Sequence, residues 1–320
     1  MNKVIISIIA IIIASGLFAE RSSAYWIWTP ESKKFINPKY AVKDSPKEQF
    51  DWAMSSYNAK DYKKAVAEFE KLVKHYEYSE YASRAQYYVG LSYENMEKDY
   101  MAYQNYQKAI DNFPHTENLD EIIEREYNIA NLYLAKAGPR LLGADIMTSL
   151  DRAVEIYKRV VDNAPYGKFA AEAQFKMGEA LKGQERYDEA IEAYQKVVDD
   201  HPDSNLFEKA KYEVAYCAYR ASLKSEYASE PTEKAIRAFE EFAEANKASD
   251  LAKEADATIQ RLKDRAAEKA YLTARFYEDR KRYDSAIIYY KEIVEEYPES
   301  SFVGEAKARI ELLEYKRSRR

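Results

Sequence analysis

The chain has 320 residues, of which 47% are hydrophobic and 32% are charged, and its net charge is −6. Its eight glycines and nine prolines are too few for a collagen-like chain, a flexible linker or a β-barrel with many turns. The negative charge argues against nucleic acid as a partner, because phosphate groups are bound by basic surfaces. Long helices joined by short turns fit this composition, and we predict an all-α protein.

Residues 1–24 have the pattern of a secretory signal peptide. Lys3 provides a positive charge, residues 4–19 form an almost unbroken apolar run, and small residues precede two cleavage points, after Ala19 and after Ala24. The apolar run has 16 residues, slightly fewer than the roughly 17–25 that span a bilayer. We predict a cleaved signal that sends the chain across the inner membrane, with an uncleaved anchor as the alternative.

Residues 25–45 show no repeat pattern. Pro30 and Pro38 disfavour helix at the residues that precede them. Trp26, Trp28 and Phe35 nevertheless give this short stretch a large apolar area. We predict an extended arm that packs on the first repeats or on a partner.

Residues 46–298 contain six copies of a unit of about 37 residues. Each copy has a small residue in the middle of a first predicted helix, and an alanine followed four residues later by an aromatic in a second. This spacing puts the alanine and the aromatic on one helix face, so each copy predicts a hairpin of two closely packed helices. The small residues are Ala53, Gly90, Ala130, Gly178, Ala215 and Ala274, and the aromatics are Phe69, Tyr106, Tyr157, Tyr194, Phe239 and Tyr290.

The domain organisation follows from these segments. We predict a signal peptide at 1–24, an arm at 25–45, a repeat array at 46–298 and a capping helix with a basic tail at 299–320. The hairpins are expected at about 46–75, 79–112, 117–163, 167–200, 204–245 and 249–296. The insertion at 134–150 is expected to form a loop at one edge of the array.

The second copy carries a recognisable signature. The run Val89-Gly90-Leu91-Ser92-Tyr93, followed by Ala102, Tyr106 and Pro114, resembles the tetratricopeptide repeat at each main position. This resemblance implies an α-solenoid of about six hairpins, whose first helices line a concave face that binds peptides.

The end of the array narrows the resemblance. Residues 234–300, with Arg261-Leu-Lys-Asp-Arg265, Tyr283 and Tyr297-Pro298-Glu299-Ser300, are similar to the BamD-like (YfiO/ComL) family. In that family a long helix and an Arg/Tyr-bearing hairpin close the array. The opening run Asp61-Tyr62-Lys63-Lys64-Ala65 resembles the family's first repeat.

This resemblance implies a function. It predicts a non-catalytic scaffold in the periplasm, associated with the outer membrane, that binds the barrel-forming assembly subunit and unfolded outer-membrane proteins. Two features differ from the family: no cysteine lies near the predicted cleavage region, and six hairpins are predicted where five are usual. Attachment through partners or an N-terminal anchor is therefore expected. A periplasmic adaptor of the Tol or cell-wall type (CpoB-like) is the alternative.

Two sets of residues are predicted to bind partners. The repeat register places one set toward the concave face, where it would hold a peptide, although Phe50 and Leu91 are equally compatible with the core. The predicted groove residues are Phe50, Met54, Tyr57, Arg84, Tyr87 and Leu91. The predicted partner-binding residues, for which a solubilising turn is the alternative, are Arg275, Arg280, Arg282 and Tyr283.

The sequence predicts no enzyme, no cofactor and no metal site. The three histidines lie next to hairpin junctions, and Cys217 lies in an apolar run that favours a buried thiol. An enzyme site in the 134–150 insertion is the remaining alternative, but the insertion lacks a residue pair suited to acid–base catalysis.

Overall fold

The computed structural model describes residues 27–29, 34–36, 41–136, 144–224 and 230–318. The predicted signal peptide lies outside these residues. The chain divides into two compact units, Met1–Glu117 and Asn118–Arg320.

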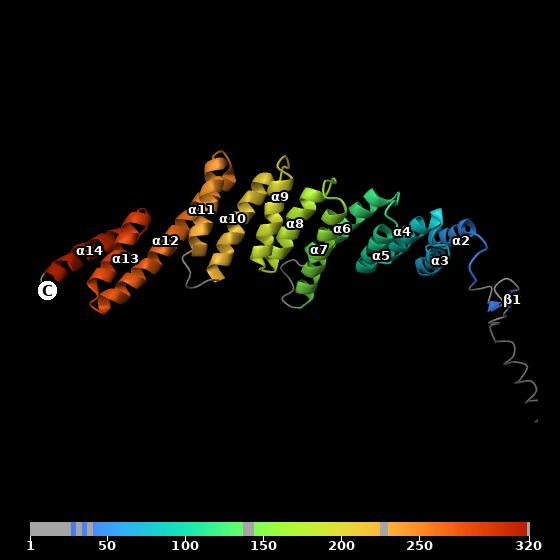
Figure 1. The fold of residues 1–320 in the computed structure, drawn as a ribbon, viewed down its shortest axis with the longest axis horizontal. Coiled ribbons are helices and arrows are strands. Elements are labelled where there is room, and N and C mark those ends of the chain that lie inside the picture. Colours follow the sequence, from blue (N-terminus) through green and yellow to red (C-terminus); the bar gives the residue numbers. More distant parts are fainter. Residues whose placement is uncertain (1–26, 30–33, 37–40, 137–143, 225–229, 319–320) are drawn as a thin grey trace, which may run out of the picture. The chain divides into compact units, whose positions relative to one another are not determined.

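The described residues of the first unit form a short β-hairpin and two helical hairpins (Figure 1). Strands β1 (Ile27–Thr29) and β2 (Lys34–Ile36) pair antiparallel. The helices are α2 (Pro46–Asn58), α3 (Tyr62–His75), α4 (Glu80–Asn95) and α5 (Asp99–Asn112). The prediction of an all-α chain did not include this β-hairpin, which lies where an extended arm was expected.

The second unit consists of helices packed against their neighbours in chain order. They are α6 (Leu119–Lys136), α7 (Ala144–Asn163), α8 (Ala170–Gly183), α9 (Tyr187–Asp200), α10 (Phe207–Lys224), α11 (Glu230–Ala245), α12 (Asp250–Asp279), α13 (Tyr283–Glu296) and α14 (Val303–Ser318). Across the described residues of both units there are six hairpins, each of two consecutive helices, and the terminal helix α14. The predicted tetratricopeptide-like fold is confirmed.

The insertion at 134–150 is not simply a loop. Helix α6 continues to Lys136 and α7 begins at Ala144, so both described ends of the insertion are helical. The residues added to this copy therefore lengthen its two helices, because apolar residues such as Leu150 extend the buried face of α7.

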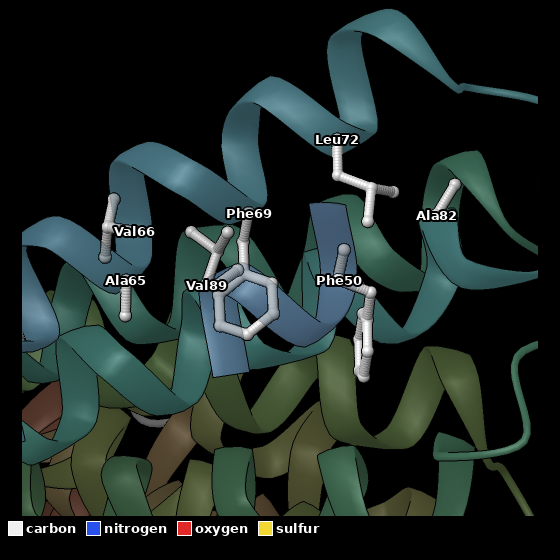
Figure 2. Packing of buried hydrophobic residues seen from close by; sticks show 9 residues of the cluster. Phe50, Ala65, Val66, Phe69, Leu72, Ala82 and Val89 are labelled. Atoms are coloured by element: carbon white, nitrogen blue, oxygen red, sulfur yellow. The ribbon is translucent and has the colours of Figure 1, made fainter. Parts of the chain in front are cut away.

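The recurring aromatic residue is the centre of each hairpin. All six of these side chains are completely buried in the structure, in agreement with the predicted close packing of the two helices. Figure 2 shows the first of them, Phe69 of α3, among side chains of α2 and α4, and its ring lies 5.6 Å from that of Phe50. The small residue on the first helix makes this packing possible: a Cβ atom on Gly90 would lie 2.4 Å from the ring of Tyr106.

Several buried tyrosines also hold the two helices of their hairpin together through the hydroxyl group. Tyr106 donates a hydrogen bond of 2.5 Å to Glu94, and Tyr290 donates one of 2.9 Å to Glu278, in each case twelve residues earlier. A buried phenol needs such a partner, because an unpaired hydroxyl group loses its bonds to water. The many tyrosines of the chain thus combine apolar packing with a polar contact at the helix end.

The turns inside four hairpins share a backbone feature. The second residue after the end of the first helix has a positive φ: Lys60, Glu97, Glu185 and Lys281, with φ between 58° and 62°. This left-handed residue reverses the chain within a few residues. In the last hairpin it lies between Arg280, which follows α12, and Arg282, which precedes α13.

Candidate binding surfaces

The structure separates the six predicted groove residues into two groups. Phe50, Tyr87 and Leu91 are buried in the core, so their prediction as exposed anchors of a groove is wrong. The rings of Tyr81 and Tyr88 lie 5.5 and 5.8 Å from that of Phe50 and cover it. The repeat register indicated which helix face these residues occupy. Whether that face is exposed to solvent depends on the neighbouring tyrosines.

The remaining groove residues stay accessible to different degrees. Met54 and Tyr57 are half-buried and Arg84 is exposed. The Arg84 guanidinium lies 4.9 Å from the centre of the Phe50 ring, within the range of a cation–π contact. Tyr57 packs edge-on against Tyr88 at 5.2 Å, which holds its ring in place.

Arg84 also lines a pocket of about 480 Å³ at the start of α4 and the end of α5. Its other walls include the apolar side chains of Tyr81, Phe113 and Pro114 and the polar side chains of Ser83 and His115. Ser83 donates a 2.9 Å hydrogen bond to Thr116, which fixes this wall. The prediction from sequence missed the pocket, although the similar segments 76–79 and 113–116 mark the two junctions that bound it.

Two of the four predicted partner-binding residues lie at an exposed turn. Arg280 is the C-cap of α12, and its guanidinium lies 3.5 Å from the centre of the Phe276 ring. It also donates a 3.3 Å hydrogen bond to the carbonyl oxygen of Phe276. Arg282 is exposed at the start of α13, so both arginines are accessible to solvent on either side of Lys281.

The other two predicted residues belong to the inside of the last hairpin. Arg275 is half-buried and donates a 3.3 Å hydrogen bond to the hydroxyl of Tyr271, which in turn bonds to Glu305. The hydrogen bond with Tyr271 raises the pKa of Arg275, so this group stays charged. Tyr283 is half-buried against the core of α12, α13 and α14. Arg275 therefore takes part in a contact between α12 and α14, and Tyr283 takes part in the core packing of the last three helices.

An exposed apolar pair beside this turn escaped the prediction from sequence. Leu272 and Phe276 are 61% and 49% exposed, and their spacing of four residues puts them on one face of α12. With Arg280 they form a stripe that we call the α12 patch (Leu272, Phe276 and Arg280). The sequence contains the signal, because residues 272, 276 and the helix cap 280 are spaced four apart. The repeat pattern, however, points only to the small and aromatic residues that pack inside the hairpins.

In the part of the chain that the structure describes, no group of three or more His, Cys, Asp or Glu side chains is arranged to hold a metal ion. None of the helices in that same part is long and apolar enough to cross a membrane.

Cys217 of α10 is expected to be unreactive in the folded protein. It is fully buried, and burial raises the pKa of its thiol to about 12. We expect alkylation at pH 8 to be at least about a hundredfold slower in buffer than in urea, because only the exposed thiolate reacts. Mass spectrometry over time measures both rates, and equal rates would contradict the packing of α10.

The buried thiol of Cys217 also makes the stability of the folded chain depend on pH. Its pKa is higher in the folded chain than the ordinary value of 9.0 that applies to the unfolded chain. The unfolded chain therefore loses this proton first, and the contribution of Cys217 to stability falls as the pH rises above about 9. The variant Cys217→Ala lacks this loss and serves as its control.

Two family models match the sequence. The tetratricopeptide repeat model matches residues 49–77, 84–116 and 172–204. The outer membrane lipoprotein model (YfiO) matches residues 221–317. No curated protein matches the chain.

Solved repeat proteins resemble the chain at low identity. MamA from residue 41 to its end, from Desulfovibrio magneticus RS-1, is 18% identical over 66% of this chain and 99% of its own, with a TM-score of 0.31. The C-terminal part of a TPR repeat-containing protein from Cytophaga hutchinsonii is 17% identical over 82% and 88%, with a TM-score of 0.33. A thermophilic TPR protein from Thermus thermophilus is 14% identical over 67% and 98%, also at 0.33. At these TM-scores the likenesses carry no argument about function.

The family models confirm both predicted resemblances. Three segments of the chain match the tetratricopeptide repeat, in agreement with its tetratricopeptide-like fold, and its last third is similar to the outer membrane lipoprotein family. That third contains α12, α13 and most of α14, and therefore the whole α12 patch.

Proposed function

We propose that this repeat protein, similar in its last third to the outer membrane lipoproteins, is a non-catalytic periplasmic scaffold in the assembly of outer-membrane β-barrels. One observation carries the proposal: the matched residues 221–317 include the exposed α12 patch and the basic turn beside it. The α12 patch would bind the barrel-forming subunit, and the pocket beside Arg84 would receive unfolded outer-membrane protein segments.

The α12 patch has the composition of a binding hot spot. An aromatic ring and an arginine are among the groups that most often dominate the energy of an interface, and Leu272 adds apolar area beside them. Arg280 is held over the ring of Phe276, so little side-chain freedom is lost when a partner covers both. The positive run from Arg280 to Arg282 in a chain of net charge −6 favours a partner with an acidic surface.

The pocket beside Arg84 fits a short stretch of an extended peptide. Tyr81, Phe113 and Pro114 offer apolar walls for one side chain, while Arg84 offers a cation for a carboxylate. Unfolded barrel segments alternate apolar and polar residues, so a single segment can supply both kinds of group.

Site-specific photo-crosslinking in living cells tests both assignments. A photoreactive residue at position 276 is expected to capture a large β-barrel protein with periplasmic repeats, and one at position 115 to capture unfolded outer-membrane proteins. Position 166 is the matched control, because Tyr166 is almost fully exposed but lies outside both sites. Capture of only Tol or cell-wall synthesis proteins at position 276 would replace the proposal with the adaptor alternative.

Negative charge introduced into the α12 patch tests how much this patch contributes to binding of the barrel-forming subunit. The double variant Leu272→Glu/Phe276→Glu is expected to lower recovery of the barrel-forming subunit at least about tenfold, since hot-spot residues each contribute about 2 kcal/mol or more. Its thermal unfolding should match that of the parent chain, because both side chains are exposed. Leu132→Glu, at an exposed leucine of α6, is the control and should leave recovery unchanged. Full recovery with the double variant would contradict the role of the α12 patch.

A further inference from the structure

The β-hairpin of the first unit presents two aromatic rings to solvent. Trp28 of β1 lies directly opposite Phe35 of β2, so both side chains share one face of the hairpin. Their ring centroids are 5.2 Å apart with an interplanar angle of 62°, an edge-to-face contact. Trp28 is nevertheless 49% exposed and Phe35 62% exposed. The two rings contact each other but remain uncovered on their outer side.

Such a hairpin needs a surface to cover it. Its strands have three residues each, and an isolated two-stranded hairpin is at best marginally stable in water. The exposed ring pair supplies apolar area on one face only, as in proteins that insert one face into an interface. Covering this face would stabilise the hairpin and bury the pair together.

The charge of the surrounding segment indicates which surface this is. Residues 25–45 contain four lysines (Lys33, Lys34, Lys39 and Lys43) and two carboxylates (Glu31 and Asp44), in a chain whose net charge is −6. The segment that holds the hairpin is thus basic, and it complements an anionic surface. Tryptophan beside lysine is typical of residues that lie at the boundary between lipid headgroups and acyl chains.

A protein strand added to the hairpin edge is less favoured. Recognition by strand addition depends on a row of backbone hydrogen bonds, and a three-residue edge offers very few of them. It would also leave the ring pair exposed, because strand addition extends the sheet sideways and does not cover its face.

We propose that the Trp28 and Phe35 face of this hairpin inserts into the headgroup region of a bilayer that contains anionic lipid. The rings enter the boundary of the acyl chains, and the excess of lysine over acidic residues in the sequence of residues 25–45 favours anionic headgroups. This contact holds the chain at a membrane surface without a segment that crosses it. It is independent of the proposed role in barrel assembly.

Fluorescence of Trp28 tests the insertion directly. In the chain without the predicted signal peptide (residues 1–24), and with Trp26→Phe and Trp52→Phe, Trp28 is the sole tryptophan, since the sequence has three. With vesicles of phosphatidylethanolamine and phosphatidylglycerol, its emission is expected to shift to the blue and to be quenched by brominated acyl chains. Replacing the phosphatidylglycerol with phosphatidylcholine, or raising the salt concentration, is expected to weaken binding.

A matched pair of variants separates the hairpin from other contacts. Trp28→Ser/Phe35→Ser is expected to reduce vesicle affinity at least about tenfold in flotation. Tyr78→Ser/Tyr166→Ser removes two almost fully exposed aromatics elsewhere and should leave the affinity unchanged.

Three results would overturn the proposal. The first is flotation of the chain with no quenching of Trp28, which would assign binding to another segment. The second is unchanged affinity of Trp28→Ser/Phe35→Ser. The third is a Trp28 emission already shifted to the blue and shielded from acrylamide without vesicles, which would mean that protein covers the ring pair.

Discussion

Replacing Tyr106 with alanine is expected to lower the free energy of unfolding by about 3–5 kcal/mol, the usual cost of removing a buried aromatic side chain. Tyr106 of α5 is completely buried, and its ring lies against Gly90 of α4 and 5.9 Å from the ring of Tyr87. Removal of the ring leaves a cavity against the backbone of α4 at Gly90, and the loss approaches the upper end of this range if the two helices do not move together to fill it. Urea unfolding followed by circular dichroism measures the loss, with hydrogen exchange in α4 and α5 as the local readout.

Removing only the hydroxyl group of Tyr106 separates the contribution of its hydrogen bond from that of the packing of its ring. Tyr106→Phe deletes the hydrogen bond to Glu94 and is expected to cost about 1 kcal/mol. Tyr194 occupies the same position in α9, but its buried hydroxyl has no hydrogen-bond partner among the described residues. Tyr194→Phe is therefore expected to be neutral or stabilising. Equal losses for the two variants would contradict the role assigned to the hydroxyl.

Gly90→Ala is expected to be destabilising by about 1–3 kcal/mol, although alanine is the better helix former by about 1 kcal/mol. The added Cβ atom would lie 2.4 Å from the ring of Tyr106, far closer than two carbon atoms can approach. The two helices must then separate, or the buried ring must leave its position. Gly178→Ala should behave alike, since its Cβ atom would lie 2.7 Å from Tyr194.

The same substitution at Gly304 provides the control. Gly304 lies in α14, and apart from its chain neighbours and the adjacent backbone of its own helix, no atom among the described residues lies within 4 Å of the Cβ atom it would gain. Gly304→Ala is expected to leave stability unchanged or to raise it by up to about 1 kcal/mol, because only helix propensity changes. If the glycine-to-alanine change lowers stability at position 90 and not at position 304, the loss at position 90 comes from the close approach of α4 and α5. A gain in stability at position 90 would show that the packing of α4 on α5 is looser than described.

The repeat pattern predicted the hairpins because the interactions that form them are close in sequence. Gly90 and Tyr106 meet within one helical hairpin, and the recurring spacing of small and aromatic residues indicates that contact directly. The same reasoning put the alanine and the aromatic of every copy on one packed helix face, and the structure adds that all six aromatics are completely buried. It failed for the insertion at 134–150, because helix length depends on whether a neighbour can bury the added turns.

Site residues were harder to predict because exposure depends on side chains from other helices. Phe50 lies on the predicted face but is covered by Tyr81 and Tyr88 of the next hairpin. Leu272 and Phe276 have ordinary apolar positions in the sequence, yet none of the described residues covers them fully. Periodicity indicates the face of a helix, whereas only the packed neighbours decide whether that face is core or surface.

The sequence by itself determined that this chain is a helical repeat protein, that an aromatic side chain fills each hairpin, and that its last third resembles the outer membrane lipoproteins. The tertiary structure decided which residues are free to bind: Arg84 at its pocket, the α12 patch and the ring pair of the β-hairpin. The physical reason is the range of the interactions. Local spacing fixes how two consecutive helices pack, but the exposure of a side chain is decided by residues that are distant in sequence.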